Sequence, residues 1–162
     1  MTPESAPIDR LADDVRARVH PRGITVAVAE SLTGGALAAA LARAQDAGEW
    51  FAGGVVAYTS ATKFRVLGVP EGPVVTARAA RAMAVGALEL TGADVAVAVT
   101  GVGGPGAEEG RPAGTVFMCT AVRTADEPVT HDFAHEFEGE PEDIVASTIE
   151  HALRHLSGAL LV

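Results

Sequence analysis

A polar hexapeptide at residues 30–35, ESLTGG, lies between an apolar run typical of a strand and a segment with helical spacing. Ligands of open α/β sheets bind at the carboxyl ends of strands, and the N–H groups that begin a helix favour negative charge. These groups could hold a phosphate, or they could stabilise an oxyanion beside a Ser31 nucleophile. Because Ser31 or Thr33 could equally act only as a helix cap, the residue types alone leave both interpretations open.

Tyr58 and Lys63 form a second candidate pair. A lysine that burial keeps neutral can act as a base toward a serine hydroxyl, and a nearby tyrosine can relay a proton or orient the nucleophile. Tyr58 ends a predicted strand and Lys63 follows five residues later on a predicted helix. This chemistry requires that Lys63 reach Ser31. The alternative is a solvated lysine beside a tyrosine whose ring is anchored in the core.

A third motif, TGVGGPG at residues 100–106, follows another predicted strand. It contains the spacing G-x-G-x-x-G, but glycines of a dinucleotide fingerprint must open a helix, and here Pro105 and Pro112 lead into a further strand. We therefore reject the dinucleotide interpretation. A glycine loop remains, which could close over a ligand at the 30–35 turn or simply connect two strands.

The remaining chemistry-bearing residues favour no metal or thiol site. The histidine pairs His131/His135 and His151/His155 are spaced i, i+4 without an H-E-x-x-H pattern, so solvated histidines are expected rather than a metal site. Cys119, the single cysteine, lies in an apolar run, which predicts a buried, inert thiol and excludes a disulfide within the chain. The sequence predicts no cofactor.

The formal net charge of −9 argues against nucleic acid as a partner, because binding to a polyanion needs basic surface. It does not exclude a mononucleotide, since a few backbone N–H groups can hold a small anion. The N-terminus lacks an apolar signal region, and the apolar runs stop short of a membrane span. The expected location is the cytoplasm, with no membrane association.

The elements that must position these motifs alternate along the chain. Helices are predicted at 2–20 (with Thr2 and Pro3 beginning the helix), from about 37 to 44, at 60–67, from the Thr76 cap to Gly92, and from Pro141 onward; strands are predicted at 24–29, 53–58, 93–100, 115–122 and 129–137. This order predicts one α/β domain over residues 1–162, with a mixed β-sheet flanked by helices on both faces. With aromatic residues at only 4%, its core is built from Ala, Val and Leu.

Four motifs in this order, AESLTGG, GGVVAYTSATKFRVLGV, VAVTGVGGPG and RPAGTVF, resemble the CinA C-terminal domain family. The resemblance covers about residues 5–158. It implies a homo-oligomeric amidohydrolase similar to the stand-alone nicotinamide-mononucleotide deamidases, which form nicotinic acid mononucleotide and release ammonia without a metal. The same family supplies the C-terminal part of longer competence/damage-inducible proteins, whose N-terminal nucleotide hydrolase domain this sequence does not contain.

The resemblance assigns roles by position. Ser31 is the implied nucleophile, and Tyr58 and Lys63 are the residues that would activate it. The implied substrate-binding residues are Glu30, Thr33, Gly34, Gly35, Thr100, Gly101 and Gly104. The implied partner is a small mononucleotide substrate.

The sequence departs from the family pattern at several positions. Leu32 stands where cysteine is usual, Gly103 stands where alanine is usual, and the segment between Gly68 and Thr76 is short. The run FEGEP at residues 137–141 lacks an arginine that the family often has. The missing arginine and the short segment support an alternative function, a non-catalytic nucleotide-binding module that has lost deamidase activity.

Overall fold

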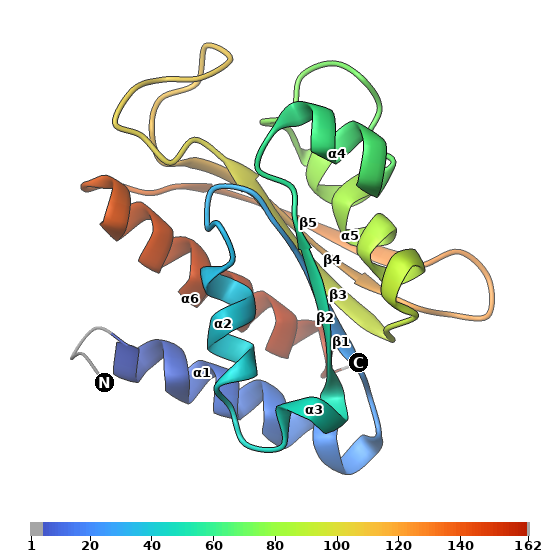
Figure 1. Ribbon diagram of the computed structural model, residues 1–162. Helices are drawn as coiled ribbons and strands as arrows, with labels where there is room; N and C mark the ends of the chain where they lie inside the picture. The colour runs from blue at the N-terminus through green and yellow to red at the C-terminus, as the bar shows by residue number, and fades with distance from the viewer. Residues whose placement is uncertain (1–4, 162) are drawn as a thin grey trace.

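A five-stranded sheet lies between two layers of helices in the computed structural model, which describes residues 5–161 (Figure 1). The strands are β1 (Val26–Glu30), β2 (Phe51–Val56), β3 (Val95–Gly101), β4 (Thr115–Val122) and β5 (Val129–Glu136), arranged in the order β2-β1-β3-β4-β5. The first three strands of that order are parallel, whereas β4 and β5 are each antiparallel to their neighbour. The predicted fold class, an α/β domain with a mixed sheet, is confirmed.

The helices divide between the two faces of the sheet. Their bounds are α1 (Ser5–Val19), the 3-10 turn η1 (His20–Arg22), α2 (Ala36–Ala42), α3 (Ala47–Trp50), α4 (Ser60–Leu67), α5 (Ala77–Thr91) and α6 (Pro141–Ala159). One hydrophobic core joins α1, α2 and α6 to one face, and a second core joins α4 and α5 to the other (Figure 1). No helix within residues 5–161 combines the length and apolar character needed to cross a membrane.

Strict alternation of valine and alanine in β1 and β3 gives the two faces different side-chain sizes. The valines of both strands, such as Val28 and Val97, pack in the core beneath α1, α2 and α6, whereas the alanines, such as Ala27 and Ala96, face α5. Side chains alternate between the faces of a strand, so this sequence pattern directly sets the thickness of each layer. The alanine face lets α5 pack close to the sheet.

Most predicted element boundaries agree with the structure, with a few corrections. Helix α4 covers the predicted range, and α5 begins after Thr76, whose side chain accepts a hydrogen bond from the N–H of Ala79 at 3.0 Å. Strand β2 begins two residues before the predicted start and ends at Val56, which leaves Tyr58 beyond the strand. The four-residue helix α3 was not predicted. The predicted helix start at residues 2–3 lies outside the described residues.

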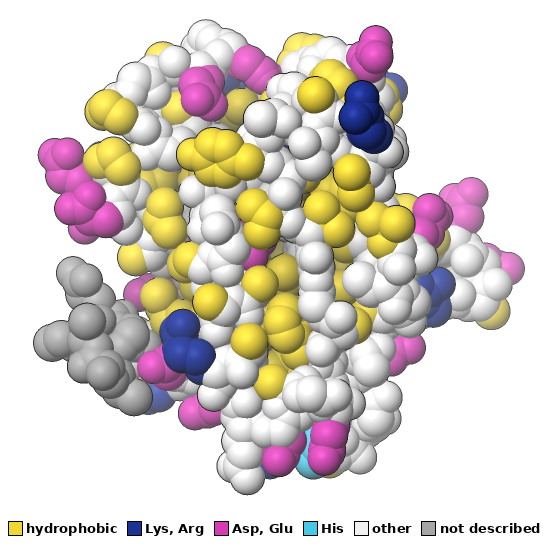
Figure 2. Space-filling model, viewed as in Figure 1, with side chains coloured by type: hydrophobic (Ala, Val, Ile, Leu, Met, Phe, Trp, Pro, Cys, Tyr) yellow, Lys and Arg dark blue, Asp and Glu magenta, His cyan; other side chains and the backbone are white. Residues whose placement is uncertain are grey.

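The surface agrees with the acidic composition of the chain, which has 21 Asp and Glu against 12 Lys and Arg. On the face drawn in Figure 2, the basic side chains lie apart from one another and do not gather over any one element. This face therefore offers no concentrated positive charge to a polyanion.

Candidate active site

The carboxylate of Glu30 fills the N-terminus of α2. Glu30 is the last residue of β1 and is fully buried. Its Oε1 accepts hydrogen bonds from Thr33 Oγ1 at 2.6 Å and from the N–H groups of Leu37 at 2.9 Å and Gly35 at 3.2 Å, and its Oε2 accepts from the N–H of Ala38 at 2.9 Å. The chain therefore supplies its own anion at the helix end where the sequence suggested a ligand.

The rest of the 30–35 turn is also bonded internally. The N–H of Gly34 donates to the carbonyl oxygen of Ser31 at 3.0 Å, and the N–H of Gly35 is held by Glu30. Both glycines have φ in the left-handed region, at 56° and 102°, which explains why glycine stands at these positions. Among the described residues, the N–H groups of Leu32 and Thr33 have no hydrogen-bond partner in the turn.

One cavity of about 320 Å³ collects five of the predicted site residues. It lies at the edge of the sheet where β1 and β3 end, and Figure 1 shows the turn after β1 and the loop after β3 leaving from that edge. The lining residues are Ser31, Tyr58, Thr59, Ser60, Lys63, Val74, Val75, Thr100, Gly101, Glu108 and Glu109. Four other predicted residues, Glu30, Thr33, Gly34 and Gly35, support the turn that carries Ser31 but do not line the cavity.

Lys63 is buried in this cavity, with only 2% of its surface exposed. Helix α4 begins at Ser60 behind a Thr59 cap, which places Lys63 in the first turn of the helix, over the cavity. Burial lowers the pKa of the Lys63 amine, and the negative charges of Glu108 and Glu109 partly oppose that shift. The solvated-lysine alternative is therefore wrong. A lysine with a lowered pKa is more often neutral, as a general base must be.

Tyr58 lies at the mouth of the cavity with 68% of its surface exposed. Lys63 Nζ donates to the main-chain carbonyl oxygen of Tyr58 at 3.4 Å. The tyrosine ring is thus not anchored in the core, contrary to the alternative considered from the sequence. Its hydroxyl is free to meet a ligand that enters from solvent.

Ser31 is 6% exposed and lines the same cavity. Its hydroxyl makes no hydrogen bond to any of the described residues. It follows directly after the buried end of β1, whose backbone is fixed by pairing with β2 and β3. A rigid strand end therefore presents an unbonded hydroxyl to the cavity that also contains Lys63.

The predicted glycine loop contributes to the cavity in part. Thr100 is buried, and its hydroxyl donates to the carbonyl oxygen of Val74 at 2.9 Å. A Cβ at Gly101 would lie 2.5 Å from the carbonyl oxygen of Thr115, so the neighbouring strand requires glycine there. Gly104 has φ of 83° and does not line the cavity.

Glu108 and Glu109 are cavity residues that the sequence analysis missed. The carboxylate of Glu109 accepts hydrogen bonds from the N–H groups of Val74 and Val75, which lie 35 and 34 residues earlier in the chain. No spacing rule connects such distant segments. The two adjacent carboxylates after a glycine- and proline-containing stretch were the available signal, but their partners were not predictable.

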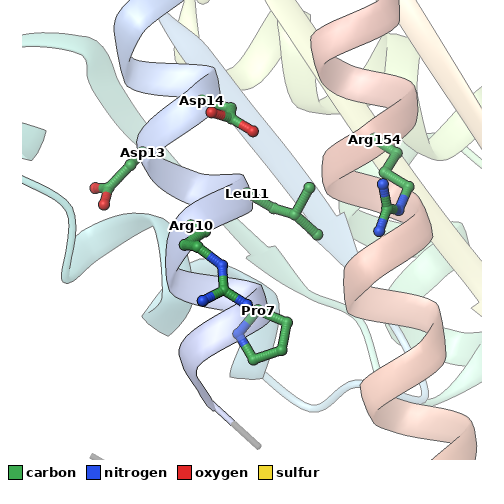
Figure 3. Close-up of a pocket in the computed structure, with 6 residues that line it drawn as sticks. All are labelled: Pro7, Arg10, Leu11, Asp13, Asp14 and Arg154. Carbon is green, nitrogen blue, oxygen red and sulfur yellow. The ribbon is translucent and has the colours of Figure 1, made fainter.

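A larger cavity, of about 370 Å³, lies elsewhere, between α1 and α6 (Figure 3). Its lining residues are Pro7, Arg10, Leu11, Asp13, Asp14 and Arg154. Figure 3 shows an open groove with charged side chains of both signs along α1 and a single arginine on α6. None of the residues predicted to do chemistry lines this groove, so the smaller cavity is the candidate active site.

The histidines and the cysteine lie away from that cavity. His135 Nε2 lies 2.8 Å from His155 Nε2, and both rings stack on phenylalanine side chains between β5 and α6, so the expectation of solvated histidines is wrong for this pair. Within residues 5–161 no group of three potential ligand side chains is placed to hold a metal ion. The predicted burial of Cys119 is confirmed, and burial raises the pKa of its thiol to about 12.

Comparison with known proteins gives consistent matches over almost the whole chain. Residues 8–160 match the profile of the CinA C-terminal domain. "Protein YdeJ" of Escherichia coli (strain K12) is 34% identical over 160 residues, which cover 95% of this chain and 91% of that protein. A CinA-like protein of Desulfotalea psychrophila is 37% identical over 159 residues, but this chain spans only 38% of its length. Among solved structures, competence damage-inducible protein A from Klebsiella pneumoniae has a TM-score of 0.89 at 36% identity, covering 95% of this chain and 97% of that one.

Proposed function

The chain belongs to the CinA C-terminal domain family, and from this premise we propose that it is an amidohydrolase acting on nicotinamide mononucleotide. The products would be nicotinic acid mononucleotide and ammonia. The observation that carries this proposal is that Ser31 and Lys63, the proposed nucleophile and base, line one cavity at the carboxyl ends of β1 and β3. The other parts of the proposal are a small mononucleotide as the ligand and assembly of the chain with copies of itself, both inferred from the family resemblance.

In the first half of the proposed reaction, neutral Lys63 takes the proton of the Ser31 hydroxyl. The serine oxygen forms a bond to the carboxamide carbon, and the carbonyl oxygen becomes an oxyanion. Collapse of this intermediate breaks the bond between carbon and nitrogen, and the nitrogen leaves as ammonia with the proton that Lys63 returns. Burial supports this role for Lys63, because it lowers the pKa of the amine.

The second half of the reaction regenerates the serine. Lys63 removes a proton from a water molecule, which attacks the acyl carbon and releases the carboxylate product as the proton returns to Ser31. The oxyanion of each half needs N–H donors close to the serine. The unbonded N–H groups of Leu32 and Thr33, which directly follow Ser31, suit this role, because in serine hydrolases the N–H of the residue after the nucleophile is a common donor.

Tyr58 has a different proposed role from that of Lys63. Its main-chain carbonyl oxygen accepts the hydrogen bond of Lys63 and so orients the amine, while its exposed hydroxyl stands at the cavity mouth. A phenol at this position can donate a hydrogen bond to the bound ligand and shield the cavity from solvent. Replacing Tyr58 by Phe is then expected to change KM more than kcat.

The test is ammonia release from nicotinamide mononucleotide by the wild type and by Ser31→Ala and Lys63→Met. Each substitution is expected to reduce kcat by at least about 10²–10³-fold, a loss comparable with that of a single oxyanion donor. Ser147→Ala, on α6, and Arg65→Met, an exposed cation on α4, are the matched controls. Full activity in Ser31→Ala would eliminate the mechanism, and binding without turnover by the wild type would favour the non-catalytic module.

A further inference from the structure

The carboxylate of Glu109 occupies an anion site within the candidate cavity. Its two oxygens lie 2.8 and 2.9 Å from the nitrogen of Val74 and 3.1 and 3.2 Å from the nitrogen of Val75. Successive backbone N–H groups that converge on one point form an anion-binding concavity. Both valines are largely buried, so this pair of donors is shielded from bulk water and opens toward the cavity.

A tight turn of the loop places the carboxylate of Glu109 at this site. Glu108 and Arg111 exchange two backbone hydrogen bonds, at 3.1 and 2.8 Å, which close a tight turn around Glu109 and Gly110. Glu109 has φ of 52°, in the left-handed region that residues other than glycine seldom adopt. Gly110 has φ of 73°, so both central residues of the turn are left-handed, as a tight two-residue hairpin turn requires.

We propose that the N–H groups of Val74 and Val75 are the subsite for the phosphate monoester of the ligand, and that Glu109 is an internal occupant which the phosphate displaces. The identity of the ligand rests on the proposed function; the existence of the anion subsite does not. A phosphate presents several oxygen acceptors, as the Glu109 carboxylate does, and can take its place on the same two donors.

One set of N–H groups cannot bind both the oxyanion of the reacting amide and the phosphate of the ligand. This assignment gives each of them its own donors. The two sets of donors belong to different segments: Leu32 and Thr33 directly follow Ser31, whereas Val74 and Val75 precede α5 and line the cavity. The reacting amide needs donors beside the serine, and the phosphate then takes the second set. The hydroxyl-bearing residue Ser60 also lines the cavity and can add a donor to a phosphate.

An internal occupant lowers the affinity for the external ligand. The measured dissociation constant is the intrinsic value divided by the fraction of molecules in which the subsite is empty. Removing the Glu109 carboxylate is therefore expected to tighten phosphate binding by roughly tenfold or more, if Glu109 fills the subsite most of the time. The neighbouring carboxylate of Glu108 provides the control, because it lines the same cavity but accepts no hydrogen bond from Val74 or Val75.

The experiment titrates inorganic phosphate into the wild type, Glu109→Ala and Glu108→Ala, with calorimetry for affinity and amide NMR shifts for location. Tighter binding in Glu109→Ala than in Glu108→Ala, with shifts at the Val74 and Val75 amides, is expected. Equal affinity in the two variants, or shifts confined to other amides, would overturn the proposal. Glu109→Gln keeps the shape but loses the charge and one acceptor oxygen, so it should tighten phosphate binding in the same direction by a smaller factor, and it replaces Glu109→Ala if that variant fails to fold.

A kinetic arm distinguishes this proposal from the proposed function. Glu109→Ala is expected to lower KM for nicotinamide mononucleotide and to leave KM for nicotinamide riboside, which lacks the phosphate, almost unchanged. An equal change for both substrates would mean that another part of the ligand takes the subsite, and it would overturn the phosphate assignment. If neither substrate is turned over, the deamidase proposal fails, while the phosphate titration still decides the subsite.

Discussion

Lys63 and Tyr58 contact each other through the lysine amine and the tyrosine main-chain carbonyl oxygen, 3.4 Å apart. The tyrosine side chain takes no part in this contact and is mostly exposed. The contact fixes the direction of the amine by backbone geometry, which side-chain substitution at residue 58 does not remove. The protonation state of Lys63 can therefore be studied with Tyr58 intact or replaced.

The pKa of Lys63 can be measured directly, because Lys63 is the only lysine in the chain. Burial lowers this pKa below the ordinary value of 10.5, so the rate of reductive methylation at Lys63 should reach its plateau at a lower pH in the native than in the unfolded protein. Peptide mass spectrometry separates Lys63 from the N-terminal amine. Activity should rise with pH through the same midpoint, because the base acts only when neutral. A native midpoint at or above that of the unfolded protein would contradict this prediction.

The effect of Glu108 and Glu109 on the pKa of Lys63 can be measured in the same way. Their charges raise the pKa of Lys63 against the effect of burial. Glu108→Gln should therefore lower the methylation midpoint further than in the wild type, without any change in the hydrogen bonds of Val74 and Val75. Glu89→Gln removes an equal charge from an exposed position on α5 and should leave the midpoint in place.

Glu30→Gln should destabilise the fold. The carboxylate accepts four hydrogen bonds at the start of α2, and an amide has only one oxygen to accept them. Loss of charge-assisted bonds at a buried site is expected to lower the free energy of unfolding by about 1.5–3 kcal/mol. Urea denaturation measures the change, with Glu89→Gln as an exposed control expected to stay within about 0.5 kcal/mol. An unchanged midpoint in Glu30→Gln would show that the charge at this helix end is not needed.

We expect the protein to lose stability in mild acid because of the partly buried pair His135 and His155. Burial, and then the charges of His135 and His151, lower the pKa of His155 to about 4, whereas an unfolded histidine has a pKa near 6.5. Between these values the unfolded chain binds more protons, so stability should fall as pH drops from about 6.5 toward 4. His155→Phe, which can keep the stack on Phe133, should flatten the dependence measured by urea denaturation. His131→Gln, at an exposed position, should leave it unchanged, and an equal flattening in both variants would refute the assignment.

Gly101→Ala should destabilise the protein for a reason of packing. The new Cβ would lie 2.5 Å from the carbonyl oxygen of Thr115 and 2.8 Å from Cα of Val116, both on the neighbouring strand. Forcing these backbones apart is expected to cost about 1–3 kcal/mol. Gly106→Ala, in the loop that follows β3, meets nothing within 4 Å and should have little effect on the melting temperature. Equal melting temperatures for the two variants would contradict the packing argument.

The elements of this fold were predictable from local patterns, because each is encoded by residues close together in the chain. Helix α5, for example, has its Thr76 cap, buried positions at helical spacing and Gly92 at its end. The apolar run at residues 93–100 likewise predicted a strand, and in the structure every residue of β3 is buried. The short helix α3 escaped prediction because four residues are too few to show a period.

The site was predictable only as a set of residues, since its contacts join distant segments. Ser31 and Lys63 were identified by type, yet their common cavity depends on the parallel pairing of β1 with β2 and β3. The sequence also suggested that a ligand would meet the N–H groups at the start of α2. The chain instead places Glu30 there, a neighbour whose direction depends on the strand end. Contacts between Glu109 and Val74 are beyond any local rule.

The two faces of the sheet should differ in how well they tolerate substitutions, because β1 and β3 carry valines on one face and alanines on the other. Where valines and leucines separate β1 and β3 from the helices on one side, a lost methyl group can be absorbed by small shifts of large side chains. On the other side β1 and β3 contribute only alanines to the core, which pack against α5 residues such as Met83 and Leu88, so added volume on the strands must displace these side chains or the helix. Because Val74 and Val75 lead directly into α5, the close packing of that helix on the alanine face also fixes the position of one wall of the cavity.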